Sequence, residues 1–372
     1  MKTTTLLAAA LLAAQAPAAD LLVPQQYGTI QEAVNAASGG DRVLVSPGTY
    51  HEQVNLSGKG ISLIGVEGAA ATALDGDHIR TVIIGIGEPS TCLVKGLTIQ
   101  RGFTNGLGGG VTIAQSSAVF EDCVFKDNRA GSGTLWGAAA WRSEYGAPQV
   151  RRCLFMRNEL EGSTSGIYHY LGGSISISDC LFVDNGSHHA NPVRVQNEGG
   201  AISFSISHCF FRDSYNTGAI GSDTATWFHP VLLWSPYSGT ISGTISDCTF
   251  DSPQVPFGMS TTRVAPVYFG GSGYQVTLSG NNACDYPTWS VQENGGPGSA
   301  WTDGGGNILK PNCCPSDLND DGDVDGIDLG ILLSDWGICP GCRSDLTGNG
   351  AVDGTVDGGD LGMLLSSWGP CP

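Results

Sequence analysis

Short apolar runs recur along most of this chain, and six of them share one pattern of residues. Each has an apolar residue, two mostly polar residues, Cys or Leu, one further residue, and then Phe or Ile. They read VKGLTIQRG (94–102), FEDCVFKDN (120–128), VRRCLFMRN (150–158), ISDCLFVDN (177–185), ISHCFFRDS (206–214) and ISDCTFDSP (245–253). The Cys or Leu position falls at 97, 123, 153, 180, 209 and 248, so the steps are 26, 30, 27, 29 and 39 residues. A period of roughly 20 to 50 residues is typical of stacked repeat folds.

The repeated segments are too short and too rich in turn residues for helices, so each repeat is predicted to be a coil of short strands. The runs GGGVTI (108–113), GGSISI (172–177) and GGAISF (199–204) are expected to supply a second strand per coil. Because side chains alternate along a strand, the Cys and the Phe two residues later point the same way, into the coil. Stacking these coils predicts an inner ladder of Cys, Phe, Ile and Val. Three asparagines are expected to stack at one turn: Asn128, Asn158 and Asn185.

Five cysteines occupy the inward position and are predicted to be free thiols that act as small apolar side chains. They are Cys123, Cys153, Cys180, Cys209 and Cys248. Disulfides between coils are the alternative: a spacing of about 4.8 Å permits them, but parallel side-chain directions fit the bond poorly. The next residue of four successive repeats should point outward, as an apolar strip that a loop, the C-terminal segment or a partner covers. These residues are Val124, Leu154, Leu181 and Phe210.

The N-terminal stretch VPQQYGTIQEAVNAASGGDRVLVSPGTYHEQVNLSGKGISLIG (23–65) resembles the start of right-handed parallel β-helix proteins of the pectin-lyase-like superfamily. The resemblance covers roughly residues 23–290. It implies an all-β solenoid with an N-terminal capping helix at about Thr29 to Ala37 and first strands at Arg42–Val45 and Ile61–Ile64. The superfamily includes lyases, hydrolases, esterases, epimerases and non-catalytic surface proteins, so the fold leaves the activity open.

Catalytic residues are not identifiable from motifs. The NTD, GHG and RIK motifs of polygalacturonase-like hydrolases, the DFIFG-type stretch of pectin methylesterases and the R-x-P-x-x-R of pectate lyases are absent from the sequence. A glycosidase requires two facing carboxylates, and a lyase requires a base with a cation or Arg that holds the sugar acid. The remaining candidates, with solvated turn residues as the alternative, are Asp75, Asp77, His78, Arg80, Arg151, Arg152, His188 and His189.

Aromatic residues gather in the stretches between the repeated strands, at 134–145, 166–173 and 224–237. Trp and Tyr rings stack on the apolar faces of sugars, and loops on a rigid scaffold commonly carry binding sites. The alternative is that these loops fold over the solenoid and bury the rings. The predicted carbohydrate-binding residues are Trp136, Trp141, Tyr145, Tyr168, Tyr170, Trp227 and Trp234.

Residues 1–18 are predicted to be a secretory signal peptide, which indicates a secreted, extracellular or cell-surface protein. MKTTTLLAAALLAAQAPAAD has a basic Lys2, an apolar run from Leu6 to Ala14, and Ala16 and Ala18 at cleavage spacing. The run is short of the roughly 20 residues that span a membrane, and no membrane span is expected elsewhere. Nucleic acid is not an expected partner, because the net charge is −18 and phosphate binding requires clustered Lys and Arg.

The acidic charge is concentrated near the C-terminus, where residues 313–372 hold eleven Asp and one Arg. The stretch DLNDDGDVDGID (317–328) fits an EF-hand-type calcium loop, with Gly322 at the turn. The predicted ligands at positions one, three, five, seven, nine and twelve are Asp317, Asn319, Asp321, Asp323, Asp325 and Asp328. One apolar helix face is expected to follow, formed by Leu329, Leu332, Leu333 and Trp336.

A second loop and helix repeat this arrangement, with Leu361, Leu364, Leu365 and Trp368 at the same spacing. The second loop carries four extra residues, so Val356 falls at its twelfth position and Asp360 would have to loop back. Its predicted ligands are Asp345, Thr347, Asn349, Asp353 and Asp360.

The two loop–helix units, about residues 314–371, resemble type I dockerin modules. The resemblance implies an α-helical calcium-binding domain and a cohesin-like or cell-surface protein as partner. Positions ten and eleven of the loops, with which dockerins contact a cohesin, are Gly326-Ile327 and Gly354-Thr355 instead of a Ser/Thr pair. If the units pack antiparallel, the cysteine offsets favour Cys314–Cys371 and Cys339–Cys342 disulfides, with a zinc site at CPGC (339–342) as the alternative.

The sequence therefore predicts a signal peptide (1–18), a parallel β-helix domain (19–312) and a dockerin-like domain (313–372). The expected function is polysaccharide binding or degradation, by a polysaccharide lyase or glycoside hydrolase if the protein is an enzyme. The alternative is a non-catalytic cell-surface or adhesion protein.

Overall fold

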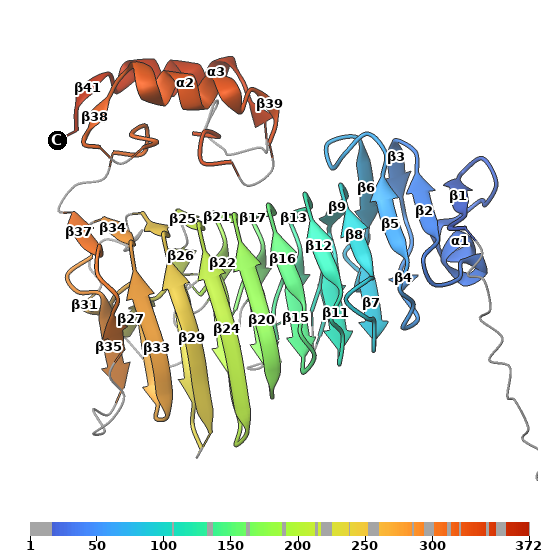
Figure 1. Ribbon diagram of the computed structural model, residues 1–372, viewed down its shortest axis with the longest axis horizontal. Helices are drawn as coiled ribbons and strands as arrows, with labels where there is room; N and C mark the ends of the chain where they lie inside the picture. Colours follow the sequence, from blue (N-terminus) through green and yellow to red (C-terminus); the bar gives the residue numbers. More distant parts are fainter. Residues whose placement is uncertain are drawn as a thin grey trace, which may run out of the picture.

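The protein is a parallel β-solenoid followed by a small C-terminal module, as the computed structural model shows (Figure 1). The structure describes residues 17–371 apart from 106–107, 132–136, 161–163, 188–190, 213–214, 217–224, 238, 252–259, 285, 294–300, 311–313, 320, 340–341 and 347–354. Trp136, His188, His189, Thr347, Asn349, Asp353 and most of the predicted signal peptide lie outside these residues.

Sheet A forms one long face of the solenoid and pairs each strand in parallel with the strand one coil further along. Its described strands, in spatial order, are β1 (Asp20–Val23), β2 (Arg42–Val45), β5 (Ser62–Gly65), β8 (Leu93–Lys95), β12 (Val119–Glu121), β16 (Gln149–Arg151), β20 (Gly173–Ser178), β24 (Ala201–Ser207), β29 (Thr240–Ser246), β33 (Tyr274–Ser279) and β36 (Thr302–Asp303). The first predicted strand agrees with β2, and the second begins one residue later than predicted, as β5.

Sheet B follows sheet A, and in the coils that carry the cysteine repeat the two are joined by a single-residue turn and the inward cysteine. Its described strands are β3 (Gly48–Tyr50), β6 (Thr72–Asp75), β9 (Thr98–Gln100), β13 (Val124–Lys126), β17 (Leu154–Met156), β21 (Leu181–Val183), β25 (Phe210–Arg212), β30 (Thr249–Phe250), β34 (Asn282–Cys284) and β37 (Ile308–Lys310). The turn residue is left-handed although it is not glycine, as at Asp122, Arg152 and Asp179 (φ 53°, 50° and 55°).

Sheet D is a short sheet that follows sheet B, and sheet C then closes the coil. The described strands of sheet D are β10 (Phe103–Thr104), β14 (Arg129–Ala130), β18 (Glu159–Leu160), β22 (Gly186–Ser187) and β26 (Tyr215–Asn216). Those of sheet C are β4 (Val54–Asn55), β7 (Ile83–Ile86), β11 (Val111–Ala114), β15 (Trp141–Glu144), β19 (Ile167–Tyr170), β23 (Val193–Gln196), β28 (Val231–Ser235), β32 (Val267–Gly271) and β35 (Ser290–Glu293). Outside these sheets, β27 (Ala225–Phe228) pairs in parallel with β31 (Ser260–Val264).

Three segments were expected to supply the second strand of their coils, and only one of them does so. GGGVTI supplies β11 in sheet C, whereas GGSISI and GGAISF form the start of β20 and β24 in sheet A. In these later coils the strands of sheet A are six or seven residues long instead of three, and they begin at Gly173 and directly after Gly200. Their sheet-C strands come from residues 167–170 and 193–196.

The inner ladder is confirmed. Phe125, Phe155, Phe182, Phe211 and Phe250 stack with ring centroids 4.5–4.9 Å apart. All five predicted cysteines are buried and free. Burial raises the pKa of Cys123 and Cys180 well above the usual range, so these thiols stay neutral and act as apolar side chains.

The asparagine ladder is also confirmed and fixes the turn between sheets B and D. Asn128 Nδ2 donates to Asn158 Oδ1, and Asn158 Nδ2 donates to Asn185 Oδ1, each over 3.0 Å. All three side chains are buried. Because the asparagine points inward, the residues on either side of it are presented on the outside of the coil.

Helix α1 (Ile30–Ala36) lies at the N-terminal end of the solenoid (Figure 1). Thr29 caps it and forms a capping box with Glu32, so the helix begins one residue after the predicted start. Its buried residues Ile30, Ala33 and Val34 belong to the solenoid core.

The C-terminal module consists of two loop–helix units with helices α2 (Gly326–Ser334) and α3 (Gly358–Ser366). Two antiparallel pairs join the units: β38 (Asp323–Val324) with β41 (Gly369–Pro370), and β39 (Gly337–Ile338) with β40 (Thr355–Val356). Both favoured disulfides, Cys314–Cys371 and Cys339–Cys342, are present.

The predicted helix faces of the module are only partly correct. The buried core is formed by Leu318, Val324, Leu332, Leu346, Val356 and Leu364. Leu333 and Leu365 are instead 52% and 51% exposed, and Trp336 and Trp368 are each 50% exposed. The two units bury one side of each helix against each other and leave these four side chains on the other side.

The module lies over the outer surface of sheet B (Figure 1). This surface carries a buried apolar cluster, here called the sheet-B strip: Ala69, Val124, Leu154, Met156, Leu181, Val183 and Phe210. The guanidinium of Arg343 lies 5.4 Å from the Phe210 ring centroid. Near Ala69, a pocket of about 660 Å³ is lined by both the solenoid and the module residues Cys339 and Cys342. The predicted covering of the four outward residues is therefore confirmed, and the C-terminal segment contributes to it.

Candidate functional site

The outer surface of sheet C carries a row of side chains that are buried although they point away from the core. The strand register aligns Arg142, Tyr168 and Arg194 on three consecutive coils. The next outward row aligns Glu144, Tyr170, Gln196 and Trp234. Together with Glu198, which follows β23, these eight residues are called the sheet-C face.

Tyr168 lies between two guanidinium groups. The carbon centres of the Arg142 and Arg194 guanidiniums lie 5.7 and 5.2 Å from its ring centroid. Its hydroxyl donates to Gln196 Oε1 over 3.0 Å, and Arg194 Nη2 donates to the same oxygen over 2.5 Å. Tyr168 is fully buried, and burial raises its pKa, so the phenol is neutral and available for cation–π contact.

Arg142 has one buried donor without a hydrogen-bond partner among the described residues. It is only 7% exposed, forms an ion pair with Glu144, and lies 5.4 Å from the Tyr170 ring centroid. Within the described part of the chain its Nε has no hydrogen-bond partner. A buried N–H without a partner is costly, and here it is a donor that an oxygen-bearing ligand would satisfy.

The edge of the sheet-C face is open. Tyr170 and Trp234 are half-buried, the Glu144 side chain is 29% exposed, and Glu198 is exposed. Burial and the neighbouring Glu198 raise the pKa of Tyr170 to about 12, so this phenol is neutral near pH 7. Trp234 lies against Gly270, where a side chain would collide with the indole ring. The edge therefore presents two aromatic rings beside two carboxylates.

The predicted carbohydrate-binding residues separate into three groups. Tyr168, Tyr170 and Trp234 belong to the sheet-C face, and Tyr145, half-exposed, follows β15 at the same end of the sheet. Trp141 is wrongly predicted: it points inward, is fully buried and packs edge-on against Phe120 at 4.5 Å. Because side chains alternate along β15, the next residue, Arg142, points outward. The side chains of Trp136 and Trp227 lie outside the described residues.

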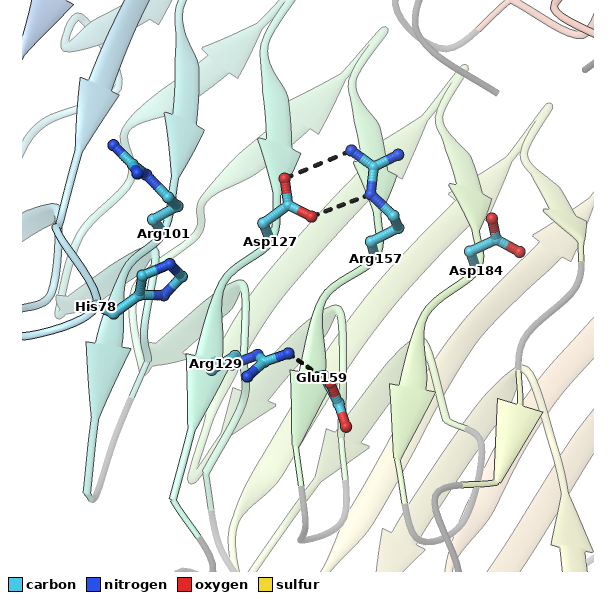
Figure 2. Close-up of a pocket in the computed structure, with 7 residues that line it drawn as sticks. All are labelled: His78, Arg101, Asp127, Arg129, Arg157, Glu159 and Asp184. Atoms are coloured by element: carbon cyan, nitrogen blue, oxygen red, sulfur yellow. Dashed lines mark hydrogen bonds and ion pairs between the residues drawn. The ribbon is translucent and has the colours of Figure 1, made fainter. Parts of the chain in front are cut away.

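A second candidate is an open groove of about 590 Å³ along the turn between sheets B and D. Figure 2 shows its seven lining residues: His78, Arg101, Asp127, Arg129, Arg157, Glu159 and Asp184. Most flank the asparagine ladder, which presents them outward. Arg157 Nε lies 3.0 Å from Asp127 Oδ1, and Arg129 Nη2 lies 3.2 Å from Glu159 Oε2. Charges of opposite sign pair on neighbouring coils here, which is the arrangement of a stabilising surface ladder.

The predicted catalytic candidates around Asp75 are brought together at the end of this groove. His51 Nδ1 lies 2.7 Å from Asp77 Oδ1, and the buried Asp75 is ion-paired with Arg101 and accepts from Gln100 Nε2 over 2.7 Å. The Asp75 pKa is lowered: burial opposes ionisation, but the Arg101 and Gln100 hydrogen bonds and the Asp77 backbone N–H outweigh it. Asp75 is therefore ionised and bound within the chain, which fits a structural role.

Arg151 and Arg152 belong to a different cluster, on the turn between sheets A and B. They bind Glu121, each over 2.7 Å, together with Lys95 at 2.6 Å. Despite burial, these cations hold the pKa of Glu121 below its usual value. The charges of this cluster pair with one another, and the cluster borders the pocket beside the sheet-B strip, so it does not join the sheet-C face.

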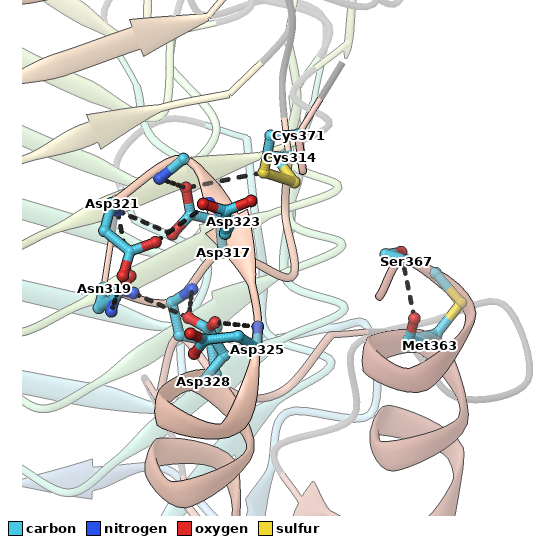
Figure 3. The surroundings of a disulfide bond; sticks show 12 residues. Cys314, Asp317, Asn319, Asp321, Asp323, Asp325, Asp328, Met363, Ser367 and Cys371 are labelled. Carbon is cyan, nitrogen blue, oxygen red and sulfur yellow. Dashed lines mark hydrogen bonds between the residues drawn. A yellow bond between two sulfur atoms is a disulfide. The ribbon is translucent and has the colours of Figure 1, made fainter. Parts of the chain in front are cut away.

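The first predicted calcium loop folds so that its acidic side chains gather on one side (Figure 3). Asp317 Oδ2 accepts from Gly322 N over 2.9 Å, and Asp321 Oδ1 accepts from Asp323 N over 3.0 Å. Asp328 is buried and accepts from Leu318 N over 2.7 Å, while Asp325 caps α2. Arg343 binds the backbone carbonyls of Asp317 and Leu318, each over 2.9 Å. An oxygen set with this much negative charge fits the hard ligands that Ca²⁺ prefers.

At the end of the second predicted loop, Asp360 and not Val356 takes the place that Asp328 has in the first loop. Asp360 accepts from Leu346 N over 2.6 Å and forms the capping box of α3, as Asp328 does with Leu318 N and α2. Val356 is a core residue in β40, facing Gly337, and corresponds to Val324, which faces Gly369. The four extra residues therefore lie before β40, and Asp360 reaches the position of a twelfth residue.

Sequence reasoning missed Arg142, Arg194, Glu144, Gln196 and Glu198. The available signal was an alignment of WRSE (141–144), IYHY (167–170), VRVQ (193–196) and VLLWS (231–235). It places a large polar or aromatic residue at the fourth position of all four segments and at the second position of the first three.

Comparison with protein-family models and with curated protein sequences gave no match. Solved structures gave distant likenesses. Pectin methylesterase from carrot has 14% identity and a TM-score of 0.42, covering 77% of this chain and 88% of its own. Pectate lyase Pel9A has 14% identity and a TM-score of 0.45, covering 81% and 78%. A GH87 α-1,3-glucanase from Streptomyces thermodiastaticus has 16% identity and a TM-score of 0.33, covering 77% and 67%. These values assign no activity, and the solenoid fold rests on the strand pairing described above.

Among the described residues, no helix combines the length and the apolar character required to cross a membrane.

Proposed function

We propose that the sheet-C face binds an acidic polysaccharide and that the solenoid is a polysaccharide-binding or polysaccharide-degrading domain. The observation that carries the proposal is the stack of Arg142, Tyr168 and Arg194 on three coils, with a buried donor of Arg142 left for a ligand. Guanidinium groups recognise carboxylates through paired hydrogen bonds. Tyr170 and Trp234 at the edge offer rings on which sugar faces stack.

Binding is tested with the purified full chain and polygalacturonate, with a neutral glucan for comparison. Arg142→Gln is expected to weaken binding to polygalacturonate by about tenfold or more, the cost of losing a buried charged hydrogen bond. Arg157→Gln, which alters a paired arginine of the groove, is the matched control and should bind like the wild type. Equal loss in both variants, or equal binding to the neutral glucan, would contradict the proposal.

Degradation would use the two carboxylates at the edge of the face. Glu144 and Glu198 belong to coils two steps apart, which is about 10 Å at about 4.8 Å per coil. This coil separation is slightly longer than the roughly 6.5–9.5 Å between the carboxyl groups of inverting glycosidases, so the two side chains would have to lean toward each other. In a lyase, the arginines would instead hold the sugar acid while a carboxylate removes a proton.

The two reactions are distinguished by their products: a hydrolase releases reducing ends alone, whereas a lyase also forms an unsaturated product that absorbs in the ultraviolet. Glu198→Gln and Glu144→Gln should abolish either product, and Glu159→Gln in the groove should not. Polysaccharide binding without either product would favour the alternative function, a non-catalytic cell-surface or adhesion protein. The ion pair between Glu144 and Arg142 is the observation that favours this alternative, because it also suits a purely structural role.

We further propose that the C-terminal module binds calcium, with Asp317, Asn319, Asp321 and Asp328 as the main side chains of the first site. Asp345 and Asp360 belong to the second, and Thr347, Asn349 and Asp353 are assigned to it from sequence. The second loop offers fewer carboxylates, so its affinity is expected to be about tenfold lower or weaker still. Calorimetric titration of the full chain tests this; a complete lack of heat or two equal, tight sites would contradict it.

The dockerin-like character of the module, and with it a cohesin-like or cell-surface partner, remains a proposal based on the duplicated loop–helix pattern. Secretion is proposed from residues 1–18 alone. N-terminal sequencing of the exported protein tests it, and a mature chain that begins at Met1 would refute the cleavage.

A further inference from the structure

We propose that the sheet-C face selects a polysaccharide in which acidic sugars are separated by neutral ones. The face combines one anion-binding position, at Arg142, with a fixed carboxylate two coils further along, at Glu198. This inference rests on the proposed binding of an acidic polysaccharide and names the class of polymer that the face accepts.

The charges of the sheet-C face sum to zero. Arg142 and Arg194 carry two positive charges, and Glu144 and Glu198 carry two negative ones. The whole chain has a net charge of −18, so its field repels a polyanion. A surface that holds a densely charged polymer is strongly positive, as in proteins that neutralise the phosphates of nucleic acids. The sheet-C face therefore suits a polymer that brings few carboxylates to it.

Arg142 is the position at which one carboxylate can bind. Its Nη2 already donates to Glu144, whereas its Nε is buried without a hydrogen-bond partner among the described residues. A ligand oxygen that accepts from Nε would complete the hydrogen bonding of the guanidinium, and a charged oxygen would do so more strongly than a neutral one. The free donor thus favours an acidic sugar at this coil.

The Glu198 side chain is held by two neighbours. Gln196 Nε2 donates to Glu198 Oε1 over 2.9 Å. The amide of Gln196 cannot turn over, because its oxygen accepts from both Tyr168 and Arg194. The hydroxyl of Tyr170 also hydrogen-bonds to Glu198. Gln196 and Tyr170 are uncharged, so they orient the carboxylate and leave its negative charge in place.

The backbone at Glu198 is fixed as well, by the buried side chain of Asn197. Asn197 Oδ1 accepts from Gly199 N over 3.1 Å and from Gly200 N over 2.9 Å. Its Nδ2 donates to Thr240 O over 3.0 Å, which ties the turn to the next coil. Glu198 itself is exposed. A ligand therefore meets it as a negative charge at a set place.

The spacing of the two positions fits a polymer that runs along the solenoid axis. Arg142 and Glu198 belong to coils two steps apart, which is about 10 Å at about 4.8 Å per coil. One sugar of an extended polysaccharide advances by a length similar to one coil. A chain with a carboxylate at Arg142 therefore carries another of its sugars past Glu198. An acidic sugar there would bring two negative charges together, whereas a neutral sugar would offer hydroxyl donors to the carboxylate.

The test is equilibrium binding of the full chain to three forms of one polymer: polygalacturonate, polygalacturonate with half of its carboxylates reduced to neutral galactose, and the fully reduced polymer. The half-reduced form should bind most tightly, roughly tenfold more tightly than the fully acidic form, because one contact between like charges is avoided. An affinity for the fully acidic form that equals or exceeds that for the half-reduced form would overturn this inference and leave the proposed binding of acidic polysaccharides standing. Equal or tighter binding of the fully reduced form, or a lack of binding to all three, would overturn both.

Glu198→Gln tests whether this carboxylate sets the selection. The variant should bind the fully acidic polymer roughly tenfold more tightly than the wild type does and should bind the half-reduced polymer with little change. Glu159→Gln, which removes a carboxylate of the groove, is the matched control and should alter neither affinity. Added salt is a second readout: it should strengthen binding of the fully acidic polymer to the wild type, because exposed like charges are screened, and do so less in Glu198→Gln. An unchanged preference between the polymers in Glu198→Gln would overturn the inference.

Discussion

His169 predicts a specific loss of stability in mild acid. It lies on the inner side of β19, fully buried, with its Nδ1 2.8 Å from Ser143 Oγ. Its Nε2 is buried and has no hydrogen-bond partner within the described residues. Burial lowers the pKa of His169 from 6.5 to about 4, because the charged imidazolium would lose its hydration in the core.

The direction of this pH effect follows from comparing the protonation of His169 in the folded and unfolded chains. Between about pH 4 and 6.5 the unfolded chain binds a proton at His169 and the folded chain does not. The contribution of the neutral imidazole to the free energy of unfolding is therefore complete above pH 6.5 and is lost as the pH falls toward 4. From pH 7 to 4.5 the free energy of unfolding should fall by about 2.5 kcal/mol, at about 1.36 kcal/mol per unit.

The assay is urea unfolding of the wild type, His169→Leu and His51→Asn at pH 7 and 4.5. His169→Leu should remove most of this pH dependence, since its neighbours one and two coils further on are Val195 and Leu233. His51→Asn, an exposed histidine paired with Asp77, is the control and should keep it. If the wild type and His169→Leu lose equal stability on acidification, the buried neutral imidazole is not the cause.

Three further predictions concern the ladders and the strip. Asn158→Ala should lower the free energy of unfolding by about 3 kcal/mol, because Phe125 O loses its side-chain donor and the Asn128 amide loses one of its two acceptors. A loss below about 1 kcal/mol in urea unfolding would contradict the ladder's role. Leu181→Asp should place an unpaired charge in the sheet-B strip and make residues 314–371 susceptible to proteolysis, and an unchanged digestion pattern would argue against docking there. Cys180 should react with a thiol reagent only at the rate of unfolding, so rapid labelling of the native chain would show that this thiol is not buried.

The solenoid was predictable because one physical constraint repeats in every coil. Stacked coils require inward residues of matching size. The residues equivalent to Cys123 and Phe125 therefore recur at a regular spacing along the sequence. The asparagine turn recurs for the same reason, since the Asn128 side chain bonds to the next coil and not to its own.

The sheet-C face was not predictable from that repeat. Sheet C follows the segments of most variable length, so no fixed spacing from a cysteine locates its strands. A shift of one residue exchanges the two faces of a strand, which is why Trp141 was assigned to the surface and Arg142 was overlooked. The contact between the solenoid and the module was hidden for a different reason: Arg212 Nη1 donates to Leu346 O over 3.4 Å, but the two residues are 134 positions apart and only folding brings them together.

The two sides of the C-terminal module differ in what they offer a partner. The side with Arg343 and Leu346 contacts β25 of the solenoid, so a second protein would have to displace the module to reach it. The other side carries Leu333, Trp336, Leu365 and Trp368, each about half-exposed and related by the internal repeat. These side chains are therefore an apolar surface that the proposed partner would reach without displacing the module. The proposed calcium loops would then face the solenoid, and the exposed helix side chains would be left for the proposed partner.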